Sequence, residues 1–281
     1  MRFEKWQALG NDYVIVEAGA LPWELTAERV RRLCEPHFGV GSDGILLLAP
    51  AEDPAHVAEL RIFNRDGSEA ELSGNGARQA ALYLRSAGWT ADDEFSIQTP
   101  AGELRPTITA PDTATLAMGR ASLASGDYPS GGSEGTGRVS AAGREWRFQH
   151  VAIGNPQCVI DAGEEVEGLD LPAIGPEIER SELFPNRTNV SFVRIDGSEV
   201  RARIFERGVG ETLSSGTGAS GAAVAAFLRG GTSPITVRLD GGALTVEVDD
   251  DLGVRLTGTA EPVFSGELSP QLVDALAAGG P

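Results

Sequence analysis

Short runs in which apolar and polar residues alternate are the main pattern along the chain. Runs of this kind, separated by glycine, proline, asparagine and aspartate, predict β-strands. The predicted strands cover residues 2–8, 13–16, 45–49, 59–64, 95–99, 104–109, 114–118, 146–153, 190–195, 200–206, 235–239, 244–248 and 254–256. With so many short strands, most of the chain is expected to form sheets.

Helical signals are few. Thr26 is a suitable N-cap for a helix that runs to about Glu35. Two more helices are predicted to begin at glycine-rich turns near Ser73 and Ser215, and a last one covers residues 269–278. Many strands with a few interspersed helices predict an α+β fold, or a sheet wrapped around a helix.

The chain contains an internal repeat. Residues 61–81 read RIFNRDGSEAELSGNGARQAA and residues 203–223 read RIFERGVGETLSSGTGASGAA, with 11 of 21 positions identical and no gap. Residues 10–19 (GNDYVIVEAG) and 154–163 (GNPQCVIDAG) form a second pair in the same order. The repeat predicts two copies of one fold.

We therefore expect two pseudosymmetric domains. The first covers residues 1–118 together with the returning segment 262–281, and the second covers residues 119–261. The segment 125–143 is rich in glycine and serine and is expected to be a flexible loop. Because interdomain clefts often hold ligands, the repeated turns are expected to converge on one site.

Composition and charge narrow the possible functions. The chain has 281 residues, 41% of them hydrophobic, and a net charge of −18. A negative charge of this size repels phosphate backbones and anionic lipid, so nucleic acid and membrane are not expected partners. No apolar run is long enough to span a membrane, and residues 1–5 lack a signal-peptide pattern. Two cysteines fit a reducing compartment, so a soluble cytoplasmic protein is expected.

Cofactor chemistry has little support in the sequence. Lys5 is the single lysine and lies in a predicted strand, where it is poorly placed for a pyridoxal Schiff base. The three histidines and two cysteines do not cluster with metal-ligand spacing. We expect neither a cofactor nor a metal. Cys34, at the end of the first helix, and Cys158, within a strand, are expected to be structural.

The repeated turns Ser73-Gly74-Asn75-Gly76-Ala77 and Ser215-Gly216-Thr217-Gly218-Ala219 carry the candidate chemistry. Each opens a helix whose first N–H groups and positive dipole end can bind an anion such as a carboxylate. Two such helix ends suit stereoinversion, in which one group removes an α-proton and another returns it from the opposite face. The helix ends would also stabilise the developing enolate-like charge.

Several long motifs make the chain resemble the diaminopimelate epimerases, which are cofactor-independent amino-acid epimerases. The motifs are LGNDY at 9–13, GVGSDG at 39–44, FNRDGSE at 63–69, SGNGAR at 73–78, GNP at 154–156, RTNV at 187–190 and ERGVGET at 206–212. The resemblance implies two mixed domains, each a barrel-like sheet around a central helix, that close on the substrate. It also implies a homodimer and a role in lysine and cell-wall synthesis. Proline racemases and hydroxyproline epimerases usually carry His at the position of Asn75, so they fit less well.

The resemblance also implies the site residues. Ser73 and Ser215 occupy the positions of the family's two acid/base cysteines, and Gln157 replaces its usual histidine. Substrate binding would fall to the side chains of Asn11, Asn64, Asn155, Asn189, Glu206 and Arg207, and to backbone donors at Gly74, Asn75, Gly216 and Thr217. The asparagines suit the ammonium and carboxylate groups of an amino acid, and Arg207 suits a carboxylate.

The two serines are a chemical departure from the family. A serine hydroxyl ionises about 7 pK units above a cysteine thiol, roughly 10 kcal/mol, and a helix end contributes only about 0.3–2 kcal/mol. Serine therefore needs a neighbouring base, for which Glu206 is the first candidate, with Asp66, Glu69 and Glu211 behind it.

Three explanations of the serines stay open. They are substitutions that trap an inactive complex, or natural residues of a carboxylate-assisted mechanism, or signs of a changed function. The leading function is epimerisation of a free amino acid, with diaminopimelate as the expected substrate. The alternatives are an isomerase or lyase of the phenazine-biosynthesis type that uses carboxylates, and a non-catalytic amino-acid-binding protein.

Overall fold

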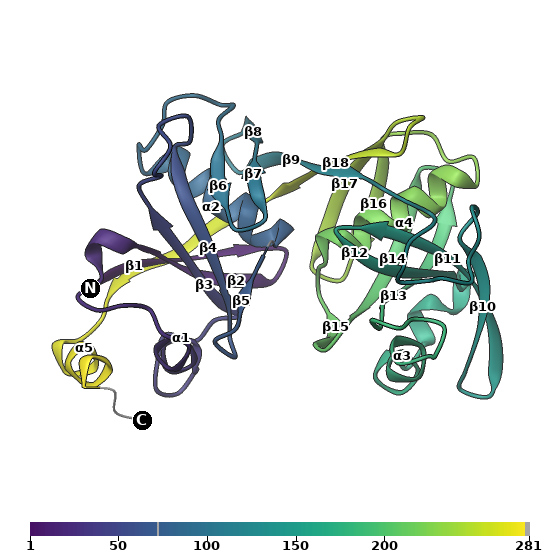
Figure 1. Ribbon diagram of the computed structural model, residues 1–281, viewed down its shortest axis with the longest axis horizontal. Helices are drawn as coiled ribbons and strands as arrows, with labels where there is room; N and C mark the ends of the chain where they lie inside the picture. The colour runs from purple at the N-terminus through teal and green to yellow at the C-terminus, as the bar shows by residue number, and fades with distance from the viewer. Residues whose placement is uncertain (72, 279–281) are drawn as a thin grey trace. The chain divides into compact units, whose positions relative to one another are not determined.

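The computed structural model describes residues 1–71 and 73–278. The chain divides into two compact units, one made of residues Met1–Leu116 and Gly258 onward, the other of Ala117–Thr257. Each unit contains a sheet and one central helix, α2 (Gly74–Ser86) in unit 1 and α4 (Gly216–Leu228) in unit 2 (Figure 1). This arrangement confirms the predicted α+β class.

The sheet of unit 1 joins the two ends of the sequence. Its strands follow the order β19 (Glu261–Glu267), β1 (Arg2–Ala8), β2 (Asn11–Glu17), β3 (Gly44–Ala49), β4 (Ala58–Asn64), β6 (Ile97–Thr99) and β7 (Gly102–Leu104), with β5 (Glu69–Ala70) beside β4. β1 pairs antiparallel with β19, and β2 pairs parallel with β3. The yellow C-terminal strand therefore lies beside the purple N-terminal one in Figure 1.

Four helical segments accompany this sheet. They are the 3-10 turn η1 (Ala18–Ala20) and the helices α1 (Ala27–Cys34), α2 and α5 (Pro270–Ala277). Thr26 caps α1 by accepting a hydrogen bond from the Arg29 amide, and Ser269 caps α5 in the same way through Leu272, as the sequence predicts. α2 contacts β1, β2 and β3, and its small residues let it lie almost wholly buried against them.

The second sheet is larger. Its order is β10 (Thr136–Ala141), β11 (Arg144–Ile153), β12 (Asn155–Asp161), β13 (Asn189–Asp196), β14 (Glu199–Glu206), β16 (Ile235–Leu239), β17 (Gly242–Val248), β18 (Gly253–Thr259), β9 (Thr113–Arg120) and β8 (Pro106–Ala110), with β15 (Gly210–Thr212) beside β14. β12 pairs parallel with β13, as β2 does with β3 in unit 1. The repeat in the sequence is therefore a repeat of local strand pairing.

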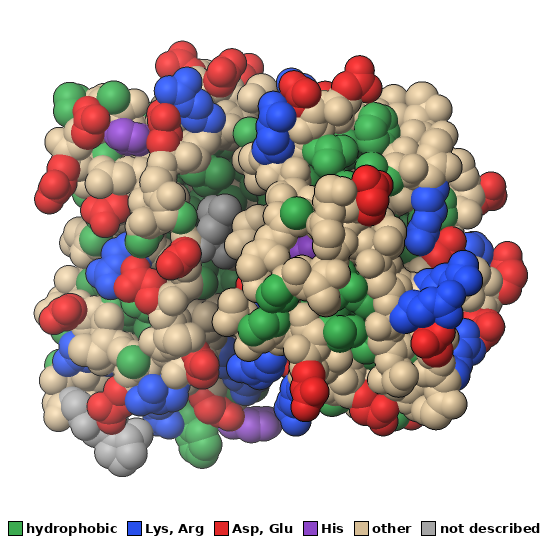
Figure 2. All heavy atoms as spheres, turned by 45° about the vertical axis from the view of Figure 1, so that its right-hand side comes forward, with side chains coloured by type: hydrophobic (Ala, Val, Ile, Leu, Met, Phe, Trp, Pro, Cys, Tyr) green, Lys and Arg blue, Asp and Glu red, His purple; other side chains and the backbone are tan. Residues whose placement is uncertain are grey.

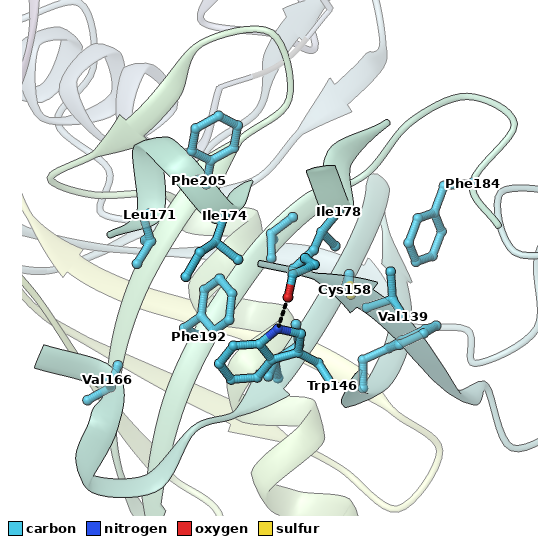
Figure 3. Close-up of a cluster of buried hydrophobic side chains, with 14 of the residues drawn as sticks. Val139, Trp146, Cys158, Val166, Leu171, Ile174, Ile178, Phe184, Phe192 and Phe205 are labelled. Atoms are coloured by element: carbon cyan, nitrogen blue, oxygen red, sulfur yellow. Dashed lines mark hydrogen bonds between the residues drawn. The ribbon is translucent and has the colours of Figure 1, made fainter. Parts of the chain in front are cut away.

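Unit 2 contains two helical segments besides α4, the 3-10 segment η2 (Gly163–Gly168) and helix α3 (Leu171–Glu179). The apolar side chains of α3 pack in a cluster with Phe192 and Phe205 (Figure 3). Trp146 lies at the base of this cluster, edge-on to Phe192, and its indole N–H donates a 3.2 Å hydrogen bond to the Ala141 carbonyl. The cluster anchors β13 and β14, the strands that lead to the repeated turn of unit 2.

The structure corrects three sequence predictions. α3 was not predicted because its sequence contains Pro172, Gly175 and Pro176; Asp170 caps it, a proline falls in its first turn, and burial of its apolar side chains outweighs propensity. The expected loop 125–143 contains strand β10, which pairs with β11. The predicted strand 104–109 is divided between β7 and β8.

The surface mixes the two signs of charge. Acidic and arginine side chains lie interspersed over the face shown in Figure 2. Most arginines pair with carboxylates, as Arg61 does with Glu69 and Arg203 with Glu211. Among the described residues, no helix is both long and apolar enough to cross a membrane.

Candidate functional site

Ser73 is the N-cap of α2. Its Oγ accepts a 3.1 Å hydrogen bond from the Gly76 amide, and the hydroxyl of Tyr13 donates to the same oxygen at 3.4 Å. Tyr13 reaches it from β2, which contacts α2. Ser73 therefore lies at the positive end of a buried helix, as predicted from its glycine-rich turn.

Ser215 repeats this geometry at the start of α4. Its backbone angles, φ −141° and ψ 120°, match the −136° and 121° of Ser73. Its Oγ accepts from the Gly218 amide at 3.3 Å. In addition, its hydroxyl donates a 3.0 Å hydrogen bond to Oε2 of Glu206, the last residue of β14. Ser215 thus has a carboxylate as its proton acceptor.

The environment of Glu206 suits a group that exchanges protons. Its second oxygen, Oε1, accepts a 2.9 Å hydrogen bond from the Thr212 hydroxyl. Burial raises the pKa of this carboxyl above its usual value, and the hydrogen bonds from Thr212 and Ser215 oppose that rise. A carboxylate with a raised pKa is a stronger base near neutral pH than an exposed one.

The two repeats differ at this position. At the shift of 142 residues, Asn64 at the end of β4 corresponds to Glu206. The Asn64 side chain donates to the Ser68 hydroxyl at 3.0 Å, whereas Glu206 accepts from Ser215. The local folds are alike, but the carboxylate belongs to unit 2 alone.

The predicted asparagines of unit 1 are held by acceptors. Asn11 donates through Nδ2 to Oδ2 of Asp43 at 2.9 Å, and its backbone carbonyl accepts from Gln79 of α2 at 3.0 Å. An ionised carboxylate can only accept, so this contact fixes the orientation of the Asn11 amide and leaves its Oδ1 as an acceptor. Lys5 supports the arrangement through a 2.7 Å ion pair with Asp12, whose carboxylate accepts from the Asp43 amide.

The asparagines of unit 2 are held by donors. Asn189 accepts a 2.7 Å hydrogen bond from the Arg207 amide, and Asn155 accepts from the side chain of Gln157. A backbone N–H can only donate, so Asn189 is left with its Nδ2 as a donor. The strand register places Gln157 opposite Asn189, which brings these residues together at the starts of the parallel strands β12 and β13. The Arg207 guanidinium donates to the Asn186 carbonyl at 2.8 Å.

The backbone donors Gly74, Asn75, Gly216 and Thr217 form the first turns of α2 and α4. The N–H groups of a helix's first turn point away from the body of the helix, towards its N-terminal end. The three other carboxylates considered as bases, Asp66, Glu69 and Glu211, have different hydrogen-bond partners. Asp66 accepts from Ser68, and Glu69 and Glu211 are paired with arginines.

Sequence reasoning gave no role to four residues that support the site. Asp43, Tyr13 and Thr212 contact Asn11, Ser73 and Glu206, respectively. Arg78 donates a hydrogen bond to the carbonyl of Gly74, the first residue of α2. Each belongs to one of the motifs GVGSDG, LGNDY, ERGVGET and SGNGAR, so motif membership was the available signal. The contacts of Asp43 and Tyr13 join distant segments, which no local pattern reveals.

The cysteines take no part in these contacts. Cys34 and Cys158 are free and buried, and burial raises the pKa of both thiols. In the described part of the chain, no group of three or more histidine, cysteine or acidic residues is placed to hold a metal ion.

Comparison with known proteins decides the family. The family model described as "Diaminopimelate epimerase" matches residues 3–124 and 149–263. The chain belongs to this family. A diaminopimelate epimerase from Desulforudis audaxviator is 41% identical over 278 residues, covering 95% of this chain and 99% of the relative. Another, from Synechococcus sp. (strain JA-3-3Ab), is 40% identical and covers 95% and 97%. The resemblance predicted from the motifs, and the predicted class of isomerase, are confirmed.

Solved structures share the fold at lower identity. A probable proline racemase from Agrobacterium radiobacter K84 aligns with a TM-score of 0.69 at 15% identity, covering 97% of this chain and 95% of that one. A phenazine biosynthesis protein of the PhzF family from Bacillus anthracis aligns with a TM-score of 0.62 at 18% identity, covering 96% and 99%. These likenesses confirm the predicted fold class.

Proposed function

We propose that this chain interconverts LL- and meso-diaminopimelate by two-base transfer of the α-proton, in lysine and peptidoglycan synthesis. The observation that carries the proposal is the hydrogen bond from Ser215, at the N-terminus of α4, to Glu206. Ser73 occupies the same N-cap position in α2, where the residue corresponding to Glu206 is Asn64. One serine oxygen takes the α-proton while the other group returns a proton to the opposite face. Membership of the epimerase family supports this reaction.

Glu206 is the group that lets a serine take part. An unassisted serine lies roughly 10 kcal/mol further from ionisation than a cysteine, about 7 pK units at 1.36 kcal/mol each. In the proposed step, Glu206 accepts the hydroxyl proton of Ser215 as the serine oxygen accepts the α-proton. At Ser215 the number of protons is therefore conserved and no alkoxide forms. On the opposite face, Ser73 gives its hydroxyl proton to the α-carbon and is reprotonated through the hydrogen bond from the Tyr13 hydroxyl. Tyr13 regains a proton from solvent, and Glu206 releases one.

The polar groups around each serine suit an amino-acid substrate. The first turns of α2 and α4 offer N–H donors for a carboxylate and for the negative charge that develops at the α-carbon. Asn11 and Asn64 offer acceptors, whereas Asn155, Asn189 and Arg207 offer donors. We propose that these residues bind the substrate's ammonium and carboxylate groups. We also propose that no cofactor is required, because the one lysine is held in an ion pair with Asp12.

A cytoplasmic homodimer completes the proposal. β19 is the edge strand of its sheet, with β1 as its described neighbour, and Val263 and Phe264 on it are about half exposed. An edge strand with exposed apolar side chains is a ready surface for a second copy of the same chain.

A second function is favoured by the same carboxylate. A half-buried glutamate with a raised pKa can move a proton without a serine, as a carboxylate-dependent isomerase or lyase of the phenazine type would. A binding protein without turnover is the non-catalytic alternative.

Exchange of the α-proton with solvent separates the three. LL- and meso-diaminopimelate are incubated with the protein in D₂O and followed by proton NMR. Exchange with inversion supports the epimerase. Elimination or rearrangement of a substrate supports the second function, and saturable binding without exchange would leave a binding protein.

A further inference from the structure

Arg78 is a buried cation without a counter-ion in the described part of the chain. Arg78 belongs to α2, and its side chain is fully buried. One terminal nitrogen donates to the Gly74 carbonyl at 3.1 Å, and the other donates to Oδ1 of Asn75 at 2.8 Å. Within residues 1–71 and 73–278, Nε has no hydrogen-bond partner. Both acceptors are neutral, so no described residue balances the positive charge of the guanidinium.

Such an arrangement is unfavourable by itself. Moving a guanidinium out of water without a paired anion carries a large desolvation penalty. Other arginines of this chain are paired, as Arg201 is with Glu167. Burial lowers the pKa of Arg78 to about 10, so the side chain remains protonated near neutral pH. A protein that keeps such a charge is expected to bind an anion close to it.

The position of Arg78 indicates where that anion binds. Its two acceptors, Gly74 and Asn75, are the first two residues of α2, whose N–H groups point out of the helix end. At the repeat shift of 142, unit 2 has Ser220, whose hydroxyl donates to the Gly216 carbonyl at 2.8 Å. Both repeats tie a side chain to the first-turn carbonyl, but only unit 1 adds a full charge.

We propose that Arg78 is a positioning residue whose counter-ion is the carboxylate of the substrate. It holds Gly74 and Asn75 in place and adds a fixed positive charge behind the N-terminus of α2. In a low-dielectric interior this charge strengthens the attraction of that turn for a carboxylate, and for the negative charge that forms when the α-proton leaves. The inference rests on the proposed function and adds to it that the N-terminal turn of α2, in unit 1, binds the substrate's carboxylate.

Two variants separate charge from hydrogen bonding. Arg78→Lys keeps the charge with fewer donors, whereas Arg78→Gln keeps an amide donor without charge. Arg61→Gln, which removes a surface charge paired with Glu69, is the control for net charge. Melting temperature is measured for each protein alone, with LL-diaminopimelate, and with succinate as a plain carboxylate at constant ionic strength. Dissociation constants come from calorimetry.

The two variants should change order when an anion is added. Without ligand, Arg78→Gln should melt at or above Arg78→Lys, because it no longer buries a charge. With either anion, Arg78→Lys should show the larger rise in melting temperature. Arg78→Gln should bind roughly 10- to 100-fold more weakly than the parent, the range expected for loss of a charged hydrogen-bonding partner. Arg61→Gln should bind as the parent does.

Failure of this inference and failure of the proposed function differ in outcome. If an anion raises the melting temperature of Arg78→Lys no more than that of Arg78→Gln, or if Arg78→Gln binds like the parent, Arg78 is structural and the inference is overturned. A parent protein that neither anion stabilises would overturn it as well. A parent that binds succinate through Arg78 but does not exchange the α-proton of diaminopimelate would reject the proposed function and support the inference.

Discussion

The hydroxyl of Ser215 donates a 3.0 Å hydrogen bond to Glu206, and the position that corresponds to Glu206 in the other repeat is Asn64. Ser73 is instead contacted by the hydroxyl of Tyr13 at 3.4 Å. The two serines therefore share a helix position but not a proton acceptor. Most of the following predictions test the consequences of that difference.

Glu206→Gln should reduce α-proton exchange by about 10²–10⁴-fold, the usual contribution of a positioned general base. Glutamine can still hydrogen-bond to Ser215 but cannot take its proton. The variant should be at least as stable as the parent at neutral pH. Because burial raises the pKa of Glu206, its charged form is disfavoured in the folded state once the pH rises above the value in the unfolded chain. NMR in D₂O and thermal unfolding measure the two effects.

The matched control for this prediction is Glu211→Gln, which removes a carboxylate paired with Arg203 on the neighbouring strand. It should leave exchange within a few-fold of the parent. Equal losses in both variants would show that Glu206 acts only through local structure.

Ser73→Cys should raise turnover more than Ser215→Cys. A thiolate at a helix N-terminus is populated near neutral pH, and Ser73 lacks the carboxylate that assists Ser215. The double variant should exceed both single variants by more than the product of their effects, because inversion needs a working group on each face. Steady-state rates of LL-to-meso conversion test this. A double variant that binds substrate but exchanges no faster than the parent would refute the interpretation that the protein is a weakened epimerase. Gln157 or a changed substrate would then explain the departure from the family.

The native cysteines should not react with a thiol reagent in the folded protein. Cys34 and Cys158 are buried, and burial raises the pKa of each thiol, so little thiolate forms. Titration with a disulfide reagent should detect thiols in the parent only after denaturation. A cysteine introduced at position 73, which is only half-buried, should add one faster-reacting thiol. Fast labelling of the parent would contradict the assigned burial.

Asp43→Asn should raise KM with little change in kcat. The variant keeps one amide oxygen but loses the negative charge, so it accepts more weakly from the Asn11 amide. The expected loss is about 0.5–1.5 kcal/mol, or roughly a threefold to tenfold rise in KM. In the double variant Asn11→Asp with Asp43→Asn, residue 43 donates to residue 11 in place of accepting from it. Residue 11 then keeps its second oxygen as an acceptor for the substrate, so KM should recover towards that of the parent. Unchanged KM in the single variant would separate Asn11 from substrate binding.

Stability should fall as the pH drops below about 6.5, the ordinary pKa of histidine. Burial lowers the pKa of His150, so below that value the unfolded chain takes up a proton that the folded protein does not. The loss ends once the pH passes below the lowered value. Denaturant unfolding between pH 5 and pH 8, a range chosen from the usual pKa of about 6.5, measures this. His150→Gln should flatten the slope, whereas replacing the exposed His37 should not.

The sequence by itself determined the repeat, most strands and the two N-cap serines. These features depend on neighbours along the chain: alternation for strands such as β1, and a serine three residues before a free amide for α2 and α4. Motifs of this length also identified the family before any geometry was available.

Only the tertiary structure decided how the site residues are used. The links of Asp43 to Asn11 and of Tyr13 to Ser73 join residues 32 and 60 positions apart, and no local pattern encodes them. Helix α3 forms despite its prolines because the core of unit 2 buries its apolar face. The charge of Arg78 could not be judged from the sequence for the same reason. Its burial, and the lack of an ion-pair partner among the described residues, are properties of packing that a sequence specifies only through the complete fold.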